Sequence, residues 1–183
     1  QRSMWERLTE YAEEYNEPGR FTALIGYEWT SSPGGNNLHR NIIFRDSKLR
    51  ADQVVPFSNY DSSDPEDLWS WMEGYEEKTG GRVLALAHNG NLSNGLMFDE
   101  MTLTSKKPID RTYADKRTRW EPMYEVTQIK GDGETHPFLS PDDEFADYET
   151  WDQGNLDLTV KKSNEMLQYE YARTALQTGL QLE

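Results

Sequence analysis

Three histidines and a set of carboxylates are the residues of this 183-residue chain best suited to chemistry. His88 ends the apolar run RVLALAH, His39 lies near the start of LHRNIIFRD, and His136 follows the acidic turn GDGET. Glu28 lies near the end of FTALIGYEW, and Glu125 lies inside MYEVTQIK. Imidazole nitrogens and carboxylate oxygens are ligands of zinc, manganese or iron, and carboxylates can bridge two cations. These five residues are the candidate metal ligands, although their spacing matches no compact motif such as H-E-x-x-H.

A structural role is the alternative for each of them. A histidine at a strand end is often simply hydrogen-bonded, Glu28 can be the solvated end of its strand, and Glu125 can point outward from an alternating strand. If the side chains do converge on a cation, the site would lower the pKa of a bound water and neutralise charge on a phosphoryl oxygen. In that case we expect Glu28, His88 and His136 to be the catalytic members.

Polar residues beside the histidines are candidate substrate ligands. The segment NGNLSNG directly follows His88. It is either a simple turn or a cradle of hydrogen-bond donors for a substrate oxyanion. In the second interpretation the substrate-binding set, with Arg40 as an anion clamp, is Arg40, Asn89, Asn91, Ser93 and Asn94. The basic stretch RTYADKRTRWE is a solvated helix face, or it offers Arg111, Arg117 and Arg119 to a phosphate or carboxylate.

Strands and helices in alternation must position these residues. Apolar spacing predicts helices over residues 3–16 and 163–179, a short helix around 113–120, and a helix that Asp64 caps and Gly80-Gly81 ends. Strands are predicted over 21–29, 38–46, 82–88 and 123–130. The first two are expected to be antiparallel, and the third to be covered on both faces because its apolar run is nearly continuous. This order indicates an α/β layer or barrel, in which chemistry sits beyond the carboxyl ends of the strands.

The acidic segment over residues 131–157 is the main alternative site. A loop of that length is usually functional or disordered, and its aromatic residues favour an ordered, packed loop. Its carboxylates belong either to a solvated loop or to a calcium site, although the EF-hand pattern is absent. The aromatic residues near loops and the acidic stretch 140–152 support a second hypothesis, in which the chain is a non-catalytic module that binds carbohydrate or calcium.

Composition narrows the partners. Asp and Glu number 33 against 19 Lys and Arg, and the formal net charge of −14 disfavours nucleic acid and anionic membrane surfaces. The absence of cysteine excludes disulfides and thiolate metal sites. No apolar run reaches the roughly 18 residues of a membrane span. The abundant aromatic residues argue against disorder and fit one folded domain over residues 1–183.

Four stretches of the chain carry a resemblance to a known family: ALIGYEWTSSPGGNNLHRNIIFRD, LAHNGNLSNGLMF, RWEPMYEVTQIKGDGETHPFLSPDDEFADYETWDQGNLD and MLQYEYARTALQTGL. They cover nearly the whole chain and resemble a large bacterial family that shares a domain of unknown function. That family is similar, through shorter motifs, to the PHP (polymerase and histidinol phosphatase) superfamily. PHP enzymes are distorted (β/α) barrels that bind several metal ions and usually hydrolyse phosphate esters.

The resemblance implies roles for the candidate ligands. Glu28 is similar to a PHP glutamate that ends an early strand and bridges metals, and His39 is similar to the histidine on the next strand. His88 resembles the strand-end histidine of an AHP-type motif, with asparagine in place of the proline. Glu125 matches an xEV strand position, and His136 belongs to the bacterial family's own GDGETHP motif.

Two PHP motifs, an early H-x-H and a late DSH, are absent from the chain, so the resemblance implies the middle of a longer enzyme. We expect an α/β fold that is part of a PHP-like distorted (β/α) barrel with long loops. We also expect incomplete binding of zinc, manganese or iron, and little activity from the fragment alone. Unpaired strand edges favour its self-association.

The function implied by the resemblance is that of a metal-dependent hydrolase. More specifically, the resemblance implies a phosphoesterase that hydrolyses a small-molecule ester with a metal-bound hydroxide. A hydrolase of a different ester or amide bond is a further alternative. No leader segment is visible at Gln1, and the compartment stays open, with a periplasmic or secreted parent as the expectation.

Overall fold

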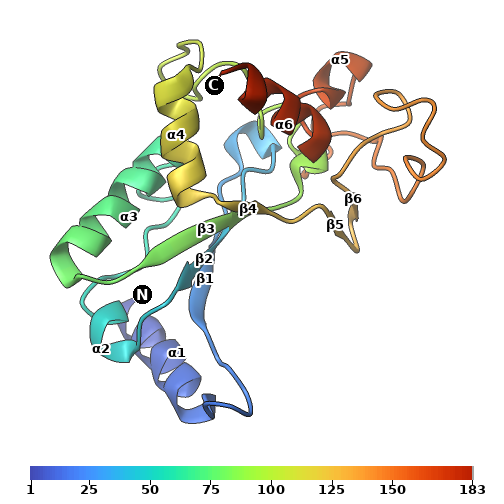
Figure 1. Cartoon of the computed structure of the whole chain (residues 1–183). Coiled ribbons are helices and arrows are strands. Elements are labelled where there is room, and N and C mark those ends of the chain that lie inside the picture. Colours follow the sequence, from blue (N-terminus) through green and yellow to red (C-terminus); the bar gives the residue numbers. More distant parts are fainter. Residues whose placement is uncertain (183) are drawn as a thin grey trace.

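An open four-stranded sheet forms the centre of the computed structural model, which describes residues 1–182 (Figure 1). The strand order is β1 (Ile25–Trp29), β2 (Arg40–Phe44), β3 (Val83–Ala87) and β4 (Met123–Tyr124). β2 is antiparallel to both β1 and β3, as predicted for the first pair, and β3 and β4 run parallel. The fold is mixed α and β, and the strands of the described chain do not close into the expected barrel.

Two long helices match their predicted positions. α1 (Arg2–Tyr15) and α3 (Pro65–Thr79) follow the apolar spacing of the sequence. The Asp64 carboxylate accepts the Glu66 N–H at 2.9 Å, which satisfies one of the free donors at the start of α3. Gly80 ends α3 with a φ of 65°, a left-handed conformation that glycine adopts at little cost. The short α2 (Lys48–Ala51) lies between β2 and α3, where no helix was predicted.

Helices cover one face of the sheet, and the main core lies between them. Alternate strand residues point to this side, where they meet α1, α3 and the end of α4 (Arg111–Trp120). The largest buried side chains of this core include Trp5, Trp29, Ile42, Phe44, Leu68, Trp69, Met72 and Tyr75. Burying this much apolar and aromatic surface is the main favourable term in the folding of the chain.

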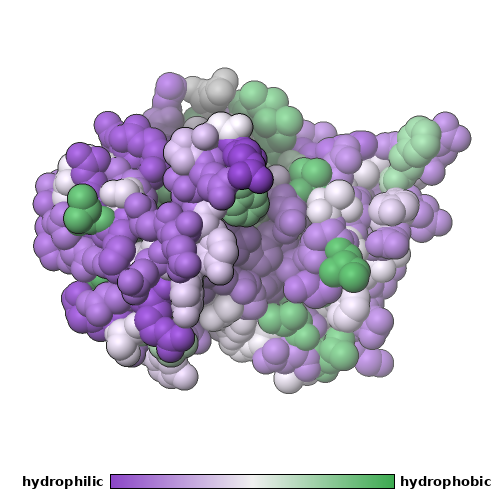
Figure 2. Space-filling view, turned by 90° about the horizontal axis from the view of Figure 1, so that it is seen from below, coloured by the Kyte–Doolittle hydropathy of each residue, from purple (hydrophilic) through white to green (hydrophobic). Residues whose placement is uncertain are grey.

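The opposite face of the sheet is only partly covered. Leu84 and Leu86 of β3 and Ile43 of β2 are half-buried, and Asn41 is exposed. The expectation that residues 82–88 are covered on both faces is therefore wrong. A nearly continuous apolar run cannot be distinguished by periodicity alone from a strand with one buried face and one partly covered face. The face of the molecule drawn in Figure 2 is mainly hydrophilic, with scattered apolar residues and a hollow near its centre.

Two predicted elements are interrupted. Residues 123–130 divide into β4 and β5 (Thr127–Gln128), because the Val126 carbonyl accepts the Gly133 N–H and the chain turns into a hairpin with β6 (Gly131–Asp132). Residues 163–179 divide into α5 (Asn164–Leu167) and α6 (Ala172–Gln181). The N–H groups of Ala172 and Arg173 donate to the carbonyls of Gly133 and Glu134, so they cannot continue α5.

The acidic loop after β6 leaves the sheet and lies on the side of α5 and α6, away from α1, α2 and α3 (orange in Figure 1). Phe138, Phe145 and Tyr148 are exposed, so the expectation that its aromatic residues are packed is wrong for these three. Polar contacts hold the loop instead. Arg173 donates to Glu134 at 2.7 Å and to Asp143 at 2.6 Å.

A buried carboxylate joins three elements of the fold. Glu121, at the end of α4, accepts hydrogen bonds from Arg40 of β2 at 2.9 Å, from the Trp69 indole of α3 at 2.9 Å, and from Arg117 of α4 at 3.1 Å. The Arg40 and Glu121 side chains are 1% and 2% exposed. Burial acts to raise the pKa of Glu121, but the two guanidinium groups outweigh it and hold the pKa below its ordinary value.

Replacing this carboxylate should be among the most destabilising single changes in the chain. Glu121→Gln leaves the buried Arg40 and the partly buried Arg117 without a counter-charge, and we expect a loss of about 3–5 kcal/mol in the free energy of unfolding at neutral pH. Because the folded pKa is depressed, the contribution of Glu121 is present above its ordinary pKa and is lost as the pH falls through the folded value. Denaturant unfolding of the unaltered chain and of Glu121→Gln, measured from pH 7 downward, checks this. The difference between their free energies of unfolding should narrow as the pH falls.

Glu73→Gln, on the exposed side of α3, is the matched control and should change the unfolding free energy by less than about 0.5 kcal/mol. Equal losses for the two variants would contradict a central role for Glu121.

Candidate functional site

Three candidate ligands meet at one edge of the sheet, on the face opposite the helices. Trp29, Arg40 and Ala87 are level with one another across β1, β2 and β3, and all three are buried. Glu28 precedes Trp29, His39 precedes Arg40 and His88 follows Ala87, so strand alternation turns these three side chains to the other face. Because β2 runs antiparallel to its neighbours, its first residues lie beside the last residues of β1 and β3. This is how Glu28, His39 and His88 converge.

One carboxylate oxygen contacts both imidazoles. Glu28 Oε1 lies 2.9 Å from His39 Nδ1 and 3.1 Å from His88 Nε2, and the two rings are nearly perpendicular, with centroids 5.9 Å apart. Ser32 Oγ lies 2.9 Å from the second nitrogen of His39. The second nitrogen of His88, Nδ1, is buried without a hydrogen-bond partner among residues 1–182. The His88 side chain is 8% exposed and that of Glu28 is 43% exposed, so the cluster is buried on one side and open on the other.

The donor set fits a divalent cation. One ligand atom from each residue lies within 4.8 Å of the other two, and no other group of three His, Asp or Glu residues meets this condition within residues 1–182. Ligand distances of about 2.0–2.1 Å around a tetrahedral ion place neighbouring ligand atoms roughly 3.3 Å apart. The two nitrogen–oxygen distances are close to that spacing. Three protein ligands and an open side are the arrangement that leaves a position for water or substrate.

Electrostatics favours a His39 imidazole that can bind a cation. Burial lowers the pKa of His39, the Glu28 carboxylate opposes this, and the charges of His88 and Lys130 add to the lowering. The balance keeps the pKa below its ordinary value, so the neutral ring is favoured. A neutral imidazole has the free lone pair that a metal ion needs.

His136 does not join this cluster. Its Nε2 lies 2.9 Å from Asp152 Oδ1, and its Nδ1 accepts the Phe138 N–H at 3.0 Å. An acceptor role for Nδ1 places the proton on Nε2, which then donates to Asp152. Both ring nitrogens are thus engaged in closing a turn of the acidic loop. To bind a metal, His136 would have to give up one of these hydrogen bonds.

Glu125 lies close to the cluster without belonging to it. Its N–H donates to the Ala87 carbonyl at 3.1 Å, and Ala87 pairs with Tyr124 in the parallel register of β3 and β4. One residue further along both strands, Glu125 is level with His88. Its carboxylate is not among the three ligand atoms that converge.

The expected substrate-binding residues separate into two groups. Asn89 and Asn91 are buried in the loop after His88, and their side-chain oxygens have no hydrogen-bond partner in the described part of the chain. Ser93 is fully buried and its hydroxyl accepts the Met97 N–H, while Asn94 donates to the Val160 carbonyl at 3.0 Å. Ser93 and Asn94 therefore stabilise the loop, whereas Asn89 and Asn91 retain unused acceptors.

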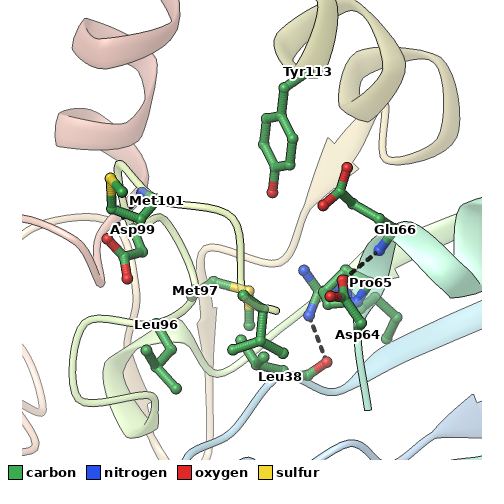
Figure 3. A pocket seen from close by; sticks show the side chains of 11 residues that line it. Leu38, Asp64, Pro65, Glu66, Leu96, Met97, Asp99, Met101 and Tyr113 are labelled. Atoms are coloured by element: carbon green, nitrogen blue, oxygen red, sulfur yellow. Dashed lines mark hydrogen bonds between the residues drawn. The ribbon is translucent and has the colours of Figure 1, made fainter. Parts of the chain in front are cut away.

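Arg40 faces away from the candidate metal centre. Its guanidinium donates to Glu121 and to the Leu38 carbonyl, inside the helix side of the fold. It lines a small pocket there with acidic and apolar neighbours, and Figure 3 shows Asp64, Glu66 and Tyr113 around that space. Arg40 thus serves the interior of the fold rather than an anionic substrate at the cluster. Arg117 is committed to Glu121 in the same way, and Arg119 donates to Glu76.

A second buried ion pair fixes the loop that follows His88. Lys162 Nζ lies 2.5 Å and 2.6 Å from the two oxygens of Glu170, and it also donates to the Asn91 carbonyl at 2.9 Å. Glu170 accepts the Gly95 N–H at 3.2 Å. Burial raises the pKa of Glu170 to about 7, against the opposing effect of Lys162. The segment 162–170 therefore packs directly on η2 (Gly90–Leu92) and the turn after it.

Sequence reasoning missed several of these partners. Ser32 lies in the loop SSPGG, which ends in η1 (Pro33–Gly35). It precedes His39 by only seven residues in the sequence, and this short separation could have suggested the contact. Lys130 lies in a glycine-containing turn that a hairpin signal could have identified. The pairing of Lys162 with Glu170 has no local signal, because it depends on the interruption between α5 and α6.

The class of protein that emerges is a mixed α/β domain with a candidate three-ligand metal centre at the edge of an open sheet. The chain belongs to the family described as "Protein of unknown function (DUF3604)", whose model matches residues 1–183. Comparison with curated proteins and with solved structures gives no match. Among the helices described, none is long and apolar enough to span a membrane.

Gly90 tests how tightly the loop beside His88 is packed. A Cβ at this position would lie 2.4 Å from the Glu170 carbonyl oxygen and 2.5 Å from the Tyr124 hydroxyl, which itself accepts the Gly90 N–H. We expect Gly90→Ala to lower the free energy of unfolding by about 1–3 kcal/mol, because backbone or ring must move.

Gly74→Ala is the matched control, because Gly74 lies inside α3 with no atom within 4 Å of an added Cβ. There alanine should stabilise by about 0.5–1 kcal/mol. Thermal or denaturant unfolding measures both. A neutral Gly90→Ala would mean that the loop is held less tightly than these contacts indicate.

Proposed function

We propose that this chain carries the metal-binding part of a metal-dependent hydrolase, most specifically a phosphoesterase. The observation that supports it best is the convergence of Glu28, His39 and His88 from three adjacent strands onto one position. Zinc, manganese and iron match a donor set of two imidazoles and a carboxylate. The resemblance to PHP enzymes adds the reaction class, because those enzymes hydrolyse phosphate esters at metal sites.

The residues have separate tasks in this proposal. Glu28, His39 and His88 hold the cation, which when bound supplies an activated water and positive charge for the ester oxygens. Ser32 orients the His39 ring through its second nitrogen. Glu125, level with His88, is placed to hold or move a proton at the open side of the cluster. Asn89 and Asn91 offer their unpartnered oxygens to substrate hydroxyl or amine groups.

In this proposal, the resemblance to PHP enzymes would make this site part of a larger one. The resemblance implies further ligands from motifs that this chain lacks, and a barrel completed by strands that it does not contain. The uncovered face of the sheet, on which the three ligands lie, would then face the interior of the barrel. An ester or amide other than a phosphate ester is the closest alternative substrate class, because the same donor set serves both.

A carbohydrate-binding module is the second candidate function. A groove in the acidic loop is lined by the exposed rings of Phe145 and Tyr148 together with several carboxylates. Aromatic faces stack on sugar rings, and carboxylates accept hydrogen bonds from sugar hydroxyls. Calcium has weaker support, because the acidic loop supplies no three-ligand cluster among residues 1–182.

Cation binding tests the leading proposal. Elemental analysis of the purified chain, followed by titration with Zn²⁺ and Mn²⁺, should show binding that His88→Ala weakens at least tenfold, because one of three ligands is lost. Glu28→Gln should have a similar effect, since the oxygen that contacts both imidazoles loses its charge.

His136→Ala is the matched control, because it removes an equally buried imidazole outside the cluster. Its effect on cation affinity should stay within about twofold, even if the acidic loop loses stability. No binding by the unaltered chain, or equal losses for His88→Ala and His136→Ala, would refute the proposal. Calcium as the only bound metal would favour the binding module.

A further inference from the structure

A lysine without an ion-pair partner lies next to the candidate metal centre. Lys130 occupies the turn between β5 and β6 and is exposed, and its ammonium forms no ion pair with a carboxylate in the described part of the chain. Its charge nevertheless acts on His39, where it contributes to lowering the pKa of the imidazole. The ammonium is therefore within electrostatic reach of the three ligands.

The backbone of this turn is fixed against the loop that follows His88. The Asn91 side-chain amide donates to the Lys130 carbonyl at 3.2 Å. Gly131 has a φ of 113°, and a Cβ there would lie 2.9 Å from the Asn91 amide nitrogen and 2.7 Å from the Glu149 carbonyl oxygen. This close approach requires glycine. The backbone of the turn is thus anchored to the loop that follows His88, while the Lys130 side chain is exposed.

The charge around the cluster differs from that of the whole chain. The protein carries a formal net charge of −14, which repels anions over most of its surface. At the cluster Glu28 is the only carboxylate among the three converging residues. A divalent cation would reverse that charge, and Lys130 adds a second positive one. An anionic group would be attracted to this part of the surface.

We propose that Lys130 binds the anionic group of the substrate, donating to a non-bridging oxygen of a phosphate or sulfate ester held at the Glu28, His39 and His88 centre. This inference rests on the proposed function and narrows it to esters that carry negative charge. A neutral ester would gain nothing from the ammonium. Lysine suits the task, because it acts as a flexible point charge toward tetrahedral oxyanions.

Anion binding to the cation-loaded chain tests this assignment. With Mn²⁺ or Zn²⁺ bound, titration calorimetry with inorganic phosphate and with sulfate should show about a tenfold loss of affinity for Lys130→Ala. Lys130→Arg should keep the affinity within about threefold, because the charge remains. Lys161→Ala, at another exposed lysine, is the matched control and should leave anion affinity unchanged. Cation affinity itself should change less than threefold in all three variants.

Turnover gives a second measurement where the chain, alone or in its parent, is active. Lys130→Ala should raise KM for nitrophenyl phosphate or nitrophenyl sulfate about tenfold with little change in kcat, and leave KM for nitrophenyl acetate unchanged. A loss confined to one of the two anions identifies which ester the site accepts.

Two results would overturn the assignment while the proposed function stands. One is equal anion affinity in Lys130→Ala and Lys161→Ala, and the other is cation binding without any anion binding. Absence of cation binding in the unaltered chain is a different result, because it refutes the proposed function and this inference with it.

Discussion

The charge on Glu121 is the constraint on which the rest of the arrangement depends. The guanidinium group of Arg40 is buried and that of Arg117 is partly buried between the sheet and the helices, and each would be costly there without a counter-charge. Glu121 supplies the counter-charge and also accepts a hydrogen bond from the Trp69 indole. One carboxylate therefore connects β2, α3 and α4. Arg40 must therefore point toward the helices. Because side chains alternate along a strand, its neighbour His39 must point to the other face, where Glu28 and His88 lie.

Segments distant in sequence then complete the surroundings of the cluster. The Asn37 side chain donates to the carbonyls of His88 and Asn89, at 2.7 Å and 3.0 Å. The pair of Lys162 with Glu170 fixes the same loop from the other side. As in many enzymes, flexible-looking loop sequence is held by buried polar contacts so that a few side chains keep a defined direction. Several buried polar atoms here nevertheless lack a hydrogen-bond partner within residues 1–182, namely the side-chain oxygens of Asn37, Asn89 and Asn91 and Nδ1 of His88.

Local pattern was sufficient for much of the fold. Apolar spacing and capping residues predicted α1 and α3, because Asp64, Pro65 and Gly80 act within a few residues of themselves. The antiparallel pair of β1 and β2 also followed from a glycine-containing loop between two apolar runs. Residues 123–130 and 163–179 read as continuous because the apolar pattern continues across each interruption. What breaks them is hydrogen bonding to Gly133 and Glu134, and no local signal encodes such a partner.

The site shows the same division. Residue chemistry and position at strand ends indicated Glu28, His39 and His88, and the structure brings these three together. Residue chemistry could not indicate the direction in which Arg40 points, because Glu121, the residue that decides this direction, is 81 positions away in the sequence. His136 belongs to a distinctive motif, yet its two hydrogen bonds, to Asp152 and to the Phe138 amide, engage it in the acidic loop. Side-chain type gives the possible chemistry, and long-range pairing decides which face it serves.

The alternation of β1 against β2 has a consequence for how the chain reaches its native state. A shift of one residue between these strands would move Glu28 to the helix face and separate it from both imidazoles. The three ligands coincide only when the two strand pairings, β1 with β2 and β2 with β3, are both in register. Any ion or molecule that needs all three therefore binds only the correctly paired sheet. By mass action such a ligand would shift the population from slipped pairings toward the native register, and so stabilise the correct strand alignment.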